Sequence, residues 1–167
     1  ATIIYHDYVD DDTWPSPHFN LAHAYNGLGW SQFYKNQYEY AIDKFLKSIE
    51  HEDYKASSAK GLGLSLYAIK NYSDAIPYLQ MALKHDPENK DMAYKLDWSI
   101  LRSESLHASQ QYFEDAVKKH PLRASPYMAL GWLHYNWRNP DLGVEYFLKA
   151  ISLDPDFALT PEFLALL

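Results

Sequence analysis

The stretch Gly27-Leu28-Gly29-Trp30-Ser31 recurs as Gly61-Leu62-Gly63-Leu64-Ser65 and, in shorter form, as Leu130-Gly131-Trp132. The matching glycines of the first two copies are 34 residues apart, and the third copy follows after twice that distance. A fixed period of this length indicates a repeat architecture. The same period places another copy at Leu96-Asp97-Trp98, where a carboxylate replaces the small glycine.

Further columns of residues keep the same period. Within each unit the apolar residues have helical spacing and short polar stretches separate the runs, so each unit is predicted to be two helices joined by a tight turn. Small residues let two helix backbones approach, and a large one fills the gap between units. The small column is Ala41, Ala75, Ser109 and Gly143; the large column is Phe45, Leu79, Phe113 and Phe147; and Pro87, Pro121 and Pro155 close three units.

This pattern resembles the tetratricopeptide repeat family, which has a period of about 34 residues and the signature W-x2-L-G-x2-Y, A-x3-F and P. The resemblance implies an all-α fold, a right-handed α-solenoid of four helix-turn-helix repeats followed by the start of a further C-terminal helix. Each repeat would bury its apolar face only against its neighbours. The four repeats are assigned to residues 22–55, 56–89, 90–123 and 124–157, within a repeat region of 22–157.

The third repeat departs most from the pattern. Asp97, Ser109 and Gln110 replace residues that are small or apolar in the other repeats. We expect a looser contact between helices there.

The flanking segments are interpreted separately. Residues 1–21 form an N-terminal leader that is extended and then enters the first helix near Ser16, with apolar residues followed by a run of aspartates. This leader is either disordered or lies in the groove of its own chain or of a second copy. Residues 158–167 look like a capping helix or a truncated fifth repeat, with Thr160 as N-cap and Pro161 inside it, or a surface that meets another chain.

The family resemblance implies a concave face lined by the first helix of each repeat, which usually holds an extended or helical peptide. On this face three tryptophans share one column. They either anchor a partner, as buried aromatics do at interfaces, or fill the core between helices. The predicted groove residues are Asn26, Trp30, Phe33 and Tyr34 in the first repeat; Lys60, Leu64 and Tyr67 in the second; Tyr94, Trp98 and Arg102 in the third; and Met128, Trp132, Tyr135 and Asn136 in the fourth.

The charged groove residues have a narrower expected role. Lys60 and Arg102 are predicted to orient an acidic or terminal carboxylate group. A well-known subclass of the family clamps the acidic C-terminal tail of large chaperones with Lys and Asn at fixed groove positions. The corresponding places of the first repeat hold Asn26 and Trp30, so we expect no such tail to bind.

Composition excludes several classes of function. The net charge of −7 and the pI near 5.5 argue against nucleic acid as a partner, because phosphate binding needs clustered Lys and Arg. The absence of Cys excludes disulfides, thiolate catalysis and Cys-ligated zinc. No apolar run is long enough for membrane insertion, so the chain is expected to be soluble. It opens with Ala1 instead of Met, which favours a processed bacterial extracytoplasmic chain or a fragment of a larger protein.

No catalytic or metal-binding motif emerges. HExxH, a Ser-His-Asp order and a paired-carboxylate cleft are absent, and the aspartates of the leader lack the Gly turn and terminal Glu of a calcium loop. The sequence therefore predicts a non-enzymatic scaffold without cofactor or metal, which binds a peptide segment of a partner in an aromatic groove. The alternatives are a carbohydrate-binding or polysaccharide-export-associated subunit, and a self-assembling scaffold whose groove is filled by its own N-terminal segment.

Overall fold

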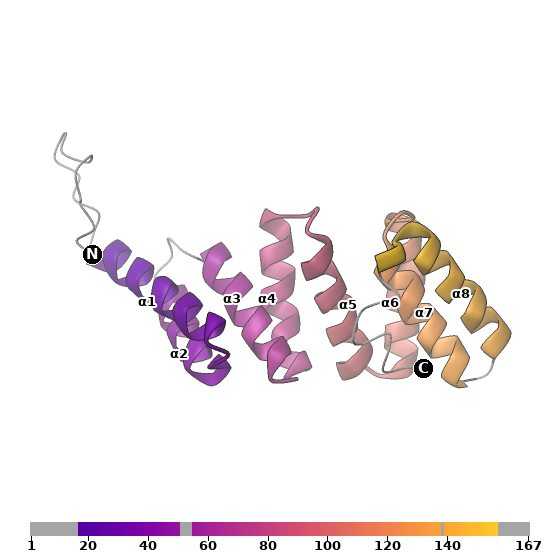
Figure 1. Ribbon diagram of the computed structural model, residues 1–167, viewed down its shortest axis with the longest axis horizontal. Coiled ribbons are helices and arrows are strands. Elements are labelled where there is room, and N and C mark those ends of the chain that lie inside the picture. The colour runs from indigo at the N-terminus through magenta and orange to yellow at the C-terminus, as the bar shows by residue number, and fades with distance from the viewer. Residues whose placement is uncertain (1–16, 51–54, 138, 157–167) are drawn as a thin grey trace.

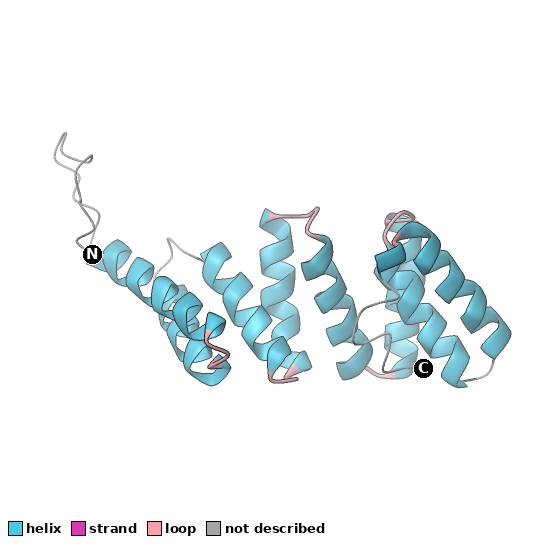
Figure 2. Cartoon of the chain, in the orientation of Figure 1, coloured by secondary structure: helices cyan, strands magenta, loops and turns pink. Residues whose placement is uncertain are grey.

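The computed structural model describes residues 17–50, 55–137 and 139–156. In this part of the chain, helices and the turns between them are the only regular structure (Figure 2). The helices follow one another along the long axis of the molecule (Figure 1). They are α1 (Pro17–Tyr34), α2 (Tyr38–Ile49), α3 (Lys55–Ala68), α4 (Tyr72–His85), α5 (Lys90–Ser103), α6 (Leu106–Lys119), α7 (Ala124–Trp137) and α8 (Pro140–Leu153).

The helices pack in consecutive pairs. Extensive contacts join α1 with α2, α3 with α4 and α7 with α8, and each pair then contacts the next through α2 with α3, α4 with α5 and α6 with α7. This arrangement confirms the predicted all-α solenoid. The predictions for residues 1–16 and for the helix in 158–167 lie outside the described residues, and the repeat boundaries stay predictions from the sequence period.

The first helices of the pairs form a layer of their own. α1 contacts α3, α3 contacts α5 and α5 contacts α7, whereas in the described part of the chain the second helices do not pack on one another to a comparable extent. In a curved stack, the helices that approach each other lie on the inner side of the curve. In this protein the layer of first helices consists of α1, α3, α5 and α7.

Glycines set the distance between the two helices of a pair. An ideal Cβ at Gly29 would lie 2.6 Å from the ring of Phe45, and one at Gly61 would lie 2.1 Å from its Cζ. Phe45 is fully buried, so its ring is wedged between α1 and α3 from its position on α2. A Cβ at Gly131 would meet Phe147 in the same way, at 2.6 Å. The helices can approach this closely only where the first helix has no side chain.

Two tight turns use the left-handed backbone region. Asn36 between α1 and α2 has φ of 59°, and Lys70 between α3 and α4 has φ of 63°. Each turn is closed by a backbone hydrogen bond, such as the one of 2.9 Å from the Asn71 N–H to the Leu66 carbonyl. Glu104 stands at the same repeat position between α5 and α6, but its backbone is extended, with φ of −88° and ψ of 163°. The turn of the third pair therefore has a different shape.

The third pair is open. α5 and α6 barely contact each other, although they are consecutive, and α6 lies next to α7 instead (Figure 1). Asp97 occupies the glycine position of α5, where its side chain is buried and bonds to Arg123 of the turn after α6. The expected loose contact in the third repeat is confirmed.

The glycine contact with Phe45 can be tested with two alanine substitutions in one column. Gly61→Ala should lower the free energy of unfolding by about 1–3 kcal/mol, because the new methyl group overpacks the wedge around Phe45. Chemical denaturation followed by circular dichroism measures the change.

Gly27→Ala is the matched control, because Gly27 lies 34 residues earlier in the same column and a Cβ there would meet nothing within 4 Å. It should raise the free energy of unfolding by about 0.5–1 kcal/mol, since glycine is unfavourable inside a helix. Equal effects of the two substitutions would contradict the wedge.

Candidate functional site

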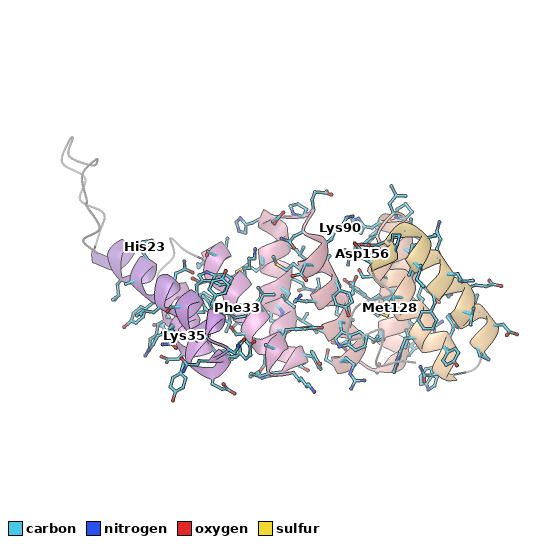
Figure 3. The ribbon with its side chains drawn as sticks, viewed as in Figure 1. His23, Phe33, Lys35, Lys90, Met128 and Asp156 are labelled. Carbon is cyan, nitrogen blue, oxygen red and sulfur yellow. The ribbon has the colours of Figure 1, made fainter. Side chains whose placement is uncertain are left out.

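The predicted groove residues divide into buried and accessible side chains. Asn26, Tyr94, Trp98 and Met128 are buried, with Trp98 only 8% and Met128 1% exposed (Figure 3). Tyr94 and Trp98 of α5 and Met128 of α7 belong to the hydrophobic core, and the Asn26 amide of α1 accepts hydrogen bonds from α3. The structure therefore makes these four residues part of the interior. The accessible or partly exposed ones are Trp30, Phe33, Tyr34, Lys60, Leu64, Tyr67, Arg102, Trp132, Tyr135 and Asn136.

An aromatic cluster occupies the end of α1. The Trp30 ring stacks on Tyr34 with 5.8 Å between centroids, and Phe33 meets Trp30 edge-on at 5.5 Å. Phe33 also meets Tyr38 edge-on across the turn to α2, at 5.5 Å, near the end of α1 that Figure 3 marks with Phe33 and Lys35. Tyr34 is the most accessible member, with 76% of its surface exposed. Each ring is held by another ring while one face of the cluster stays open to solvent.

A polar network behind the cluster fixes Trp30. Its indole Nε1 donates to Ser57 Oγ of α3 at 3.2 Å, and Ser57 Oγ donates to Asn26 Oδ1 at 3.2 Å. Ser58 Oγ lies 3.1 Å from the same amide oxygen and 2.8 Å from Ser48 Oγ. Asn26 thus bridges α1 and α3 from a buried position. Its role is to position Trp30, since its amide oxygen is engaged inside the protein.

A second group of accessible residues follows on α3. Leu64 and Lys60 are half-buried, and the Tyr67 ring meets Tyr72 of α4 edge-on at 5.6 Å. The ammonium group of Lys95 lies 5.7 Å from the centre of the Tyr67 ring. A cation over an aromatic face is attractive. Tyr67 of α3 is thus held by contacts with α4 and α5.

The fourth repeat carries a separate aromatic region. Tyr135 is 51% exposed and lies 6.2 Å from the Phe147 ring, measured between centroids. Asn136 Nδ2 donates to the Trp132 carbonyl at 2.9 Å, so this amide is turned back onto its own helix. Between the two aromatic regions stands α5, where Arg102 is the exposed groove residue.

A buried carboxylate in the third repeat was not recognised as a site from the sequence. Nη2 of Arg123 donates to both oxygens of Asp97 at 2.6 Å, and Ser125 Oγ donates to Oδ2 at 2.6 Å. Tyr112 OH donates to Oδ1 at 3.5 Å. The Asp97 side chain is only 1% exposed, against 25% for Arg123. This set of four residues, the Asp97 cluster, joins α5 to α6, to the following turn and to α7.

Burial is the main cause of the pKa shifts of Asp97 and Tyr112 in this cluster. It raises the pKa of the Asp97 carboxyl, while Arg123, Ser125 and Tyr112 act in the opposite direction. Burial, together with the negative charge of Asp97, raises the pKa of Tyr112 to about 12. Tyr112 is therefore a neutral donor to Asp97 at physiological pH.

The described residues offer no other constellation for chemistry. No three His, Asp or Glu side chains in this part of the chain come together as a metal site. Within the same residues, none of the helices combines the length and the apolar character that crossing a bilayer requires.

Stacked helix pairs with a continuous layer of first helices define a repeat protein of the α-solenoid class. Tetratricopeptide repeat models match residues 60–96 and 124–157. These two stretches of the chain are therefore tetratricopeptide repeats. This fold supports a role as a scaffold for protein–protein interaction.

Solved structures agree with the fold. One is YrrB, described as "a TPR protein with an unusual peptide-binding site", with 24% identity, a TM-score of 0.65 and coverage of 83% of this chain and 71% of that one. Another is MamA, with 21% identity, a TM-score of 0.64 and coverage of 84% and 82%. No curated protein sequence matches the chain.

The Asp97 cluster can be tested by removing its cation. Arg123→Ala leaves a buried carboxylate without its partner, which costs about 3–5 kcal/mol for a fully buried pair. Because the Arg123 side chain is partly exposed, we expect the free energy of unfolding to fall by about 2–3 kcal/mol, measured by urea denaturation.

The matched variant replaces both partners by the residues that other repeats hold in these columns. Asp97→Gly combined with Arg123→Asn, as at Gly63 and Asn89, should recover most of the lost stability. A double variant that is as unstable as Arg123→Ala would show that the charge pair is not the source of the effect.

Proposed function

We propose that this protein is a non-catalytic scaffold that binds a peptide segment of a partner protein on the α1–α3 aromatic face. This face consists of Trp30, Phe33 and Tyr34 of α1 with Leu64 and Tyr67 of α3. The observation that carries the proposal is the cluster of Trp30, Phe33 and Tyr34, whose rings are packed on one another while Tyr34 stays 76% exposed. Large aromatic side chains with an open face are the usual anchors of protein interfaces.

The rings of this face are well prepared for binding. Trp30 is held by the hydrogen bond to Ser57 and by its contacts with Phe33 and Phe45, so little side-chain entropy remains to be lost. Burying one aromatic side chain removes about 150–250 Å² from water, which contributes about 4–6 kcal/mol before the costs of association. Those costs amount to several kcal/mol, so a dissociation constant of about 1 μM is the expected scale.

The basic residues near the face suggest how a segment is oriented. Lys60 on α3 and Arg102 on α5 have no ion-pair partner among the described residues. Each is able to pair with an acidic side chain or the terminal carboxylate of the bound segment. The similarity to YrrB, a TPR protein with an unusual peptide-binding site, supports a peptide as the ligand.

Two exposed tyrosines make it possible to distinguish binding at the α1–α3 aromatic face from binding at any exposed aromatic side chain. Tyr34 lies on α1 and Tyr40 on α2, and they are 76% and 66% exposed. Tyr34→Ala should weaken binding of a peptide selected on an array of extended segments by about tenfold or more, because it removes an anchor. Tyr40→Ala should leave the affinity unchanged. Titration of tryptophan fluorescence measures both.

Three results would contradict the proposal. Equal weakening by Tyr34→Ala and Tyr40→Ala would mean that the peptide binds to any exposed tyrosine and not to this face in particular. Binding of oligosaccharides and not of peptides, with the same Tyr34 dependence, would assign the face to carbohydrate. A chain shortened by residues 1–13 that gains affinity for the peptide would show that the leader is the native occupant.

A further inference from the structure

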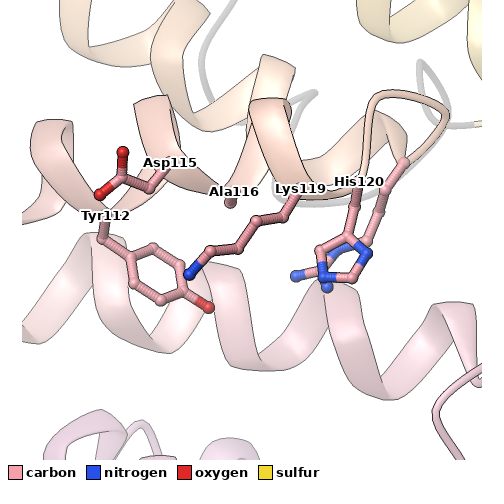
Figure 4. A pocket seen from close by; sticks show the side chains of 6 residues that line it. Tyr112, Asp115, Ala116, Lys119 and His120 are labelled. Carbon is pink, nitrogen blue, oxygen red and sulfur yellow. The ribbon is translucent and has the colours of Figure 1, made fainter.

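A half-open pocket lies on α6 and the turn that follows it. Its volume is about 290 Å³. Figure 4 shows Lys119 and Tyr112 reaching along one side of α6, with His120 at its end. The lining residues are Tyr112, Asp115, Ala116, Lys119, His120 and Arg123.

The pocket exists because the third helix pair is open. Ala116 belongs to the column of Ser48, and Ser48 Oγ donates to a backbone carbonyl of α1 at 2.9 Å. In the first pair this column therefore packs against the partner helix of the same repeat. In the third pair α5 barely contacts α6, and the same face of α6 lines a pocket.

The charged residues around the pocket differ in the ion pairs and hydrogen bonds that they already make. Arg123 is fixed by Asp97, and Asp115 accepts hydrogen bonds from Lys118 and from Gln111, both at 3.3 Å. Lys119 makes no ion pair or hydrogen bond in the part of the chain that the structure describes, although its charge contributes, after the hydrogen bonds from Gln111 and Lys118, to lowering the pKa of Asp115. The excess positive charge thus comes from Lys119, with His120 as an additional donor. The charge of Lys119 contrasts with the net charge of −7 of the chain.

We propose that this pocket binds a side-chain carboxylate of an acidic partner segment through Lys119, His120 and Arg123. Ammonium, imidazole and guanidinium groups all donate hydrogen bonds to a carboxylate, and bonds between charged groups are the stronger ones. The pocket is open to solvent and large enough for one Asp or Glu side chain. It lies on a second helix, away from the α1–α3 aromatic face, so the inference does not depend on the proposed function.

A simpler role for these cations is to complement the carbonyl end of α6. The end of α4 provides the comparison, because Lys84-His85 there is the same dipeptide as Lys119-His120. Lys84 and His85 are exposed and lie in the last turn of α4, where α3 and α4 pack closely. Both dipeptides serve the helix end, but only Lys119-His120 borders the open third pair.

The test uses the peptide acetyl-Glu-Glu-Glu-amide at low salt, followed by backbone amide NMR shifts of the full chain. Shifts should concentrate at the end of α6 and in the following turn. Combined Lys119→Gln and His120→Gln should weaken binding by about tenfold or more, because two donors to the carboxylate are lost. Combined Lys84→Gln and His85→Gln, and separately Tyr34→Ala, should leave it unchanged. Circular dichroism checks that each variant keeps its helix content.

Several results would overturn the proposal. If the two Lys-His variants weakened binding of the peptide equally, the acidic peptide would be attracted by basic surface residues in general and not by this pocket. Equal binding of acetyl-Gln-Gln-Gln-amide would show that the carboxylate is not recognised, and tighter binding of acetyl-Gly-Gly-Gly with a free C-terminus would assign the pocket to chain ends. Shifts that map to the α1–α3 aromatic face instead would place the acidic segment there.

Discussion

The ring of Phe45 touches the backbone of two first helices at once, because Gly29 and Gly61 have no side chain to keep it away. This contact fixes the distance between α1 and α2 and, through the same ring, the distance between one repeat and the next. Gly131 and Phe147 repeat the arrangement near the other end of the chain. The first helices are thereby drawn into a common layer, and the position of every accessible aromatic residue on that layer follows from this spacing.

The third repeat has no glycine at this position of its first helix, because Asp97 occupies it. A carboxylate at the glycine position prevents close packing of α6, and its burial requires compensation by Arg123, Ser125 and Tyr112. Buried ion pairs seldom stabilise a protein more than well-packed apolar residues would. In the same helix pair α5 and α6 barely contact each other, the turn is extended at Glu104 and a pocket lies on α6, although Ser109, Phe113 and Ala116 of α6 stay buried.

Much of the fold could be predicted from the sequence because the repeat period records contacts between neighbouring helices. The helix pairs and the loose third repeat both follow from columns such as Gly29, Gly63 and Asp97. Exposure could not be predicted in the same way. A column gives the direction of a side chain, but within this one column Trp98 is buried whereas Trp30, Leu64 and Trp132 are partly exposed.

The Asp97 cluster also could not be predicted from the repeat period. Asp97 and Arg123 are 26 residues apart and belong to no common column, so nothing periodic connects them. A buried carboxylate in a column of glycines does require a cation, and the turn after α6 supplies the nearest one in the fold. The unusual position of Asp97 therefore predicts that a basic residue lies near it, but it does not predict which one.

The two halves of the stack are consequently held by different forces. α1 to α5 are joined by a continuous series of close helix contacts, which gives the α1–α3 aromatic face a fixed geometry. α6, α7 and α8 are joined to this part chiefly through the packing of α5 on α7 and through the Asp97 cluster. Because Asp97 is buried and bonded directly to Arg123, salt screens this ion pair much less than it screens the ion pairs on the surface. The junction between the two halves therefore combines the apolar packing of α5 on α7 with the buried ion pair of Asp97 and Arg123.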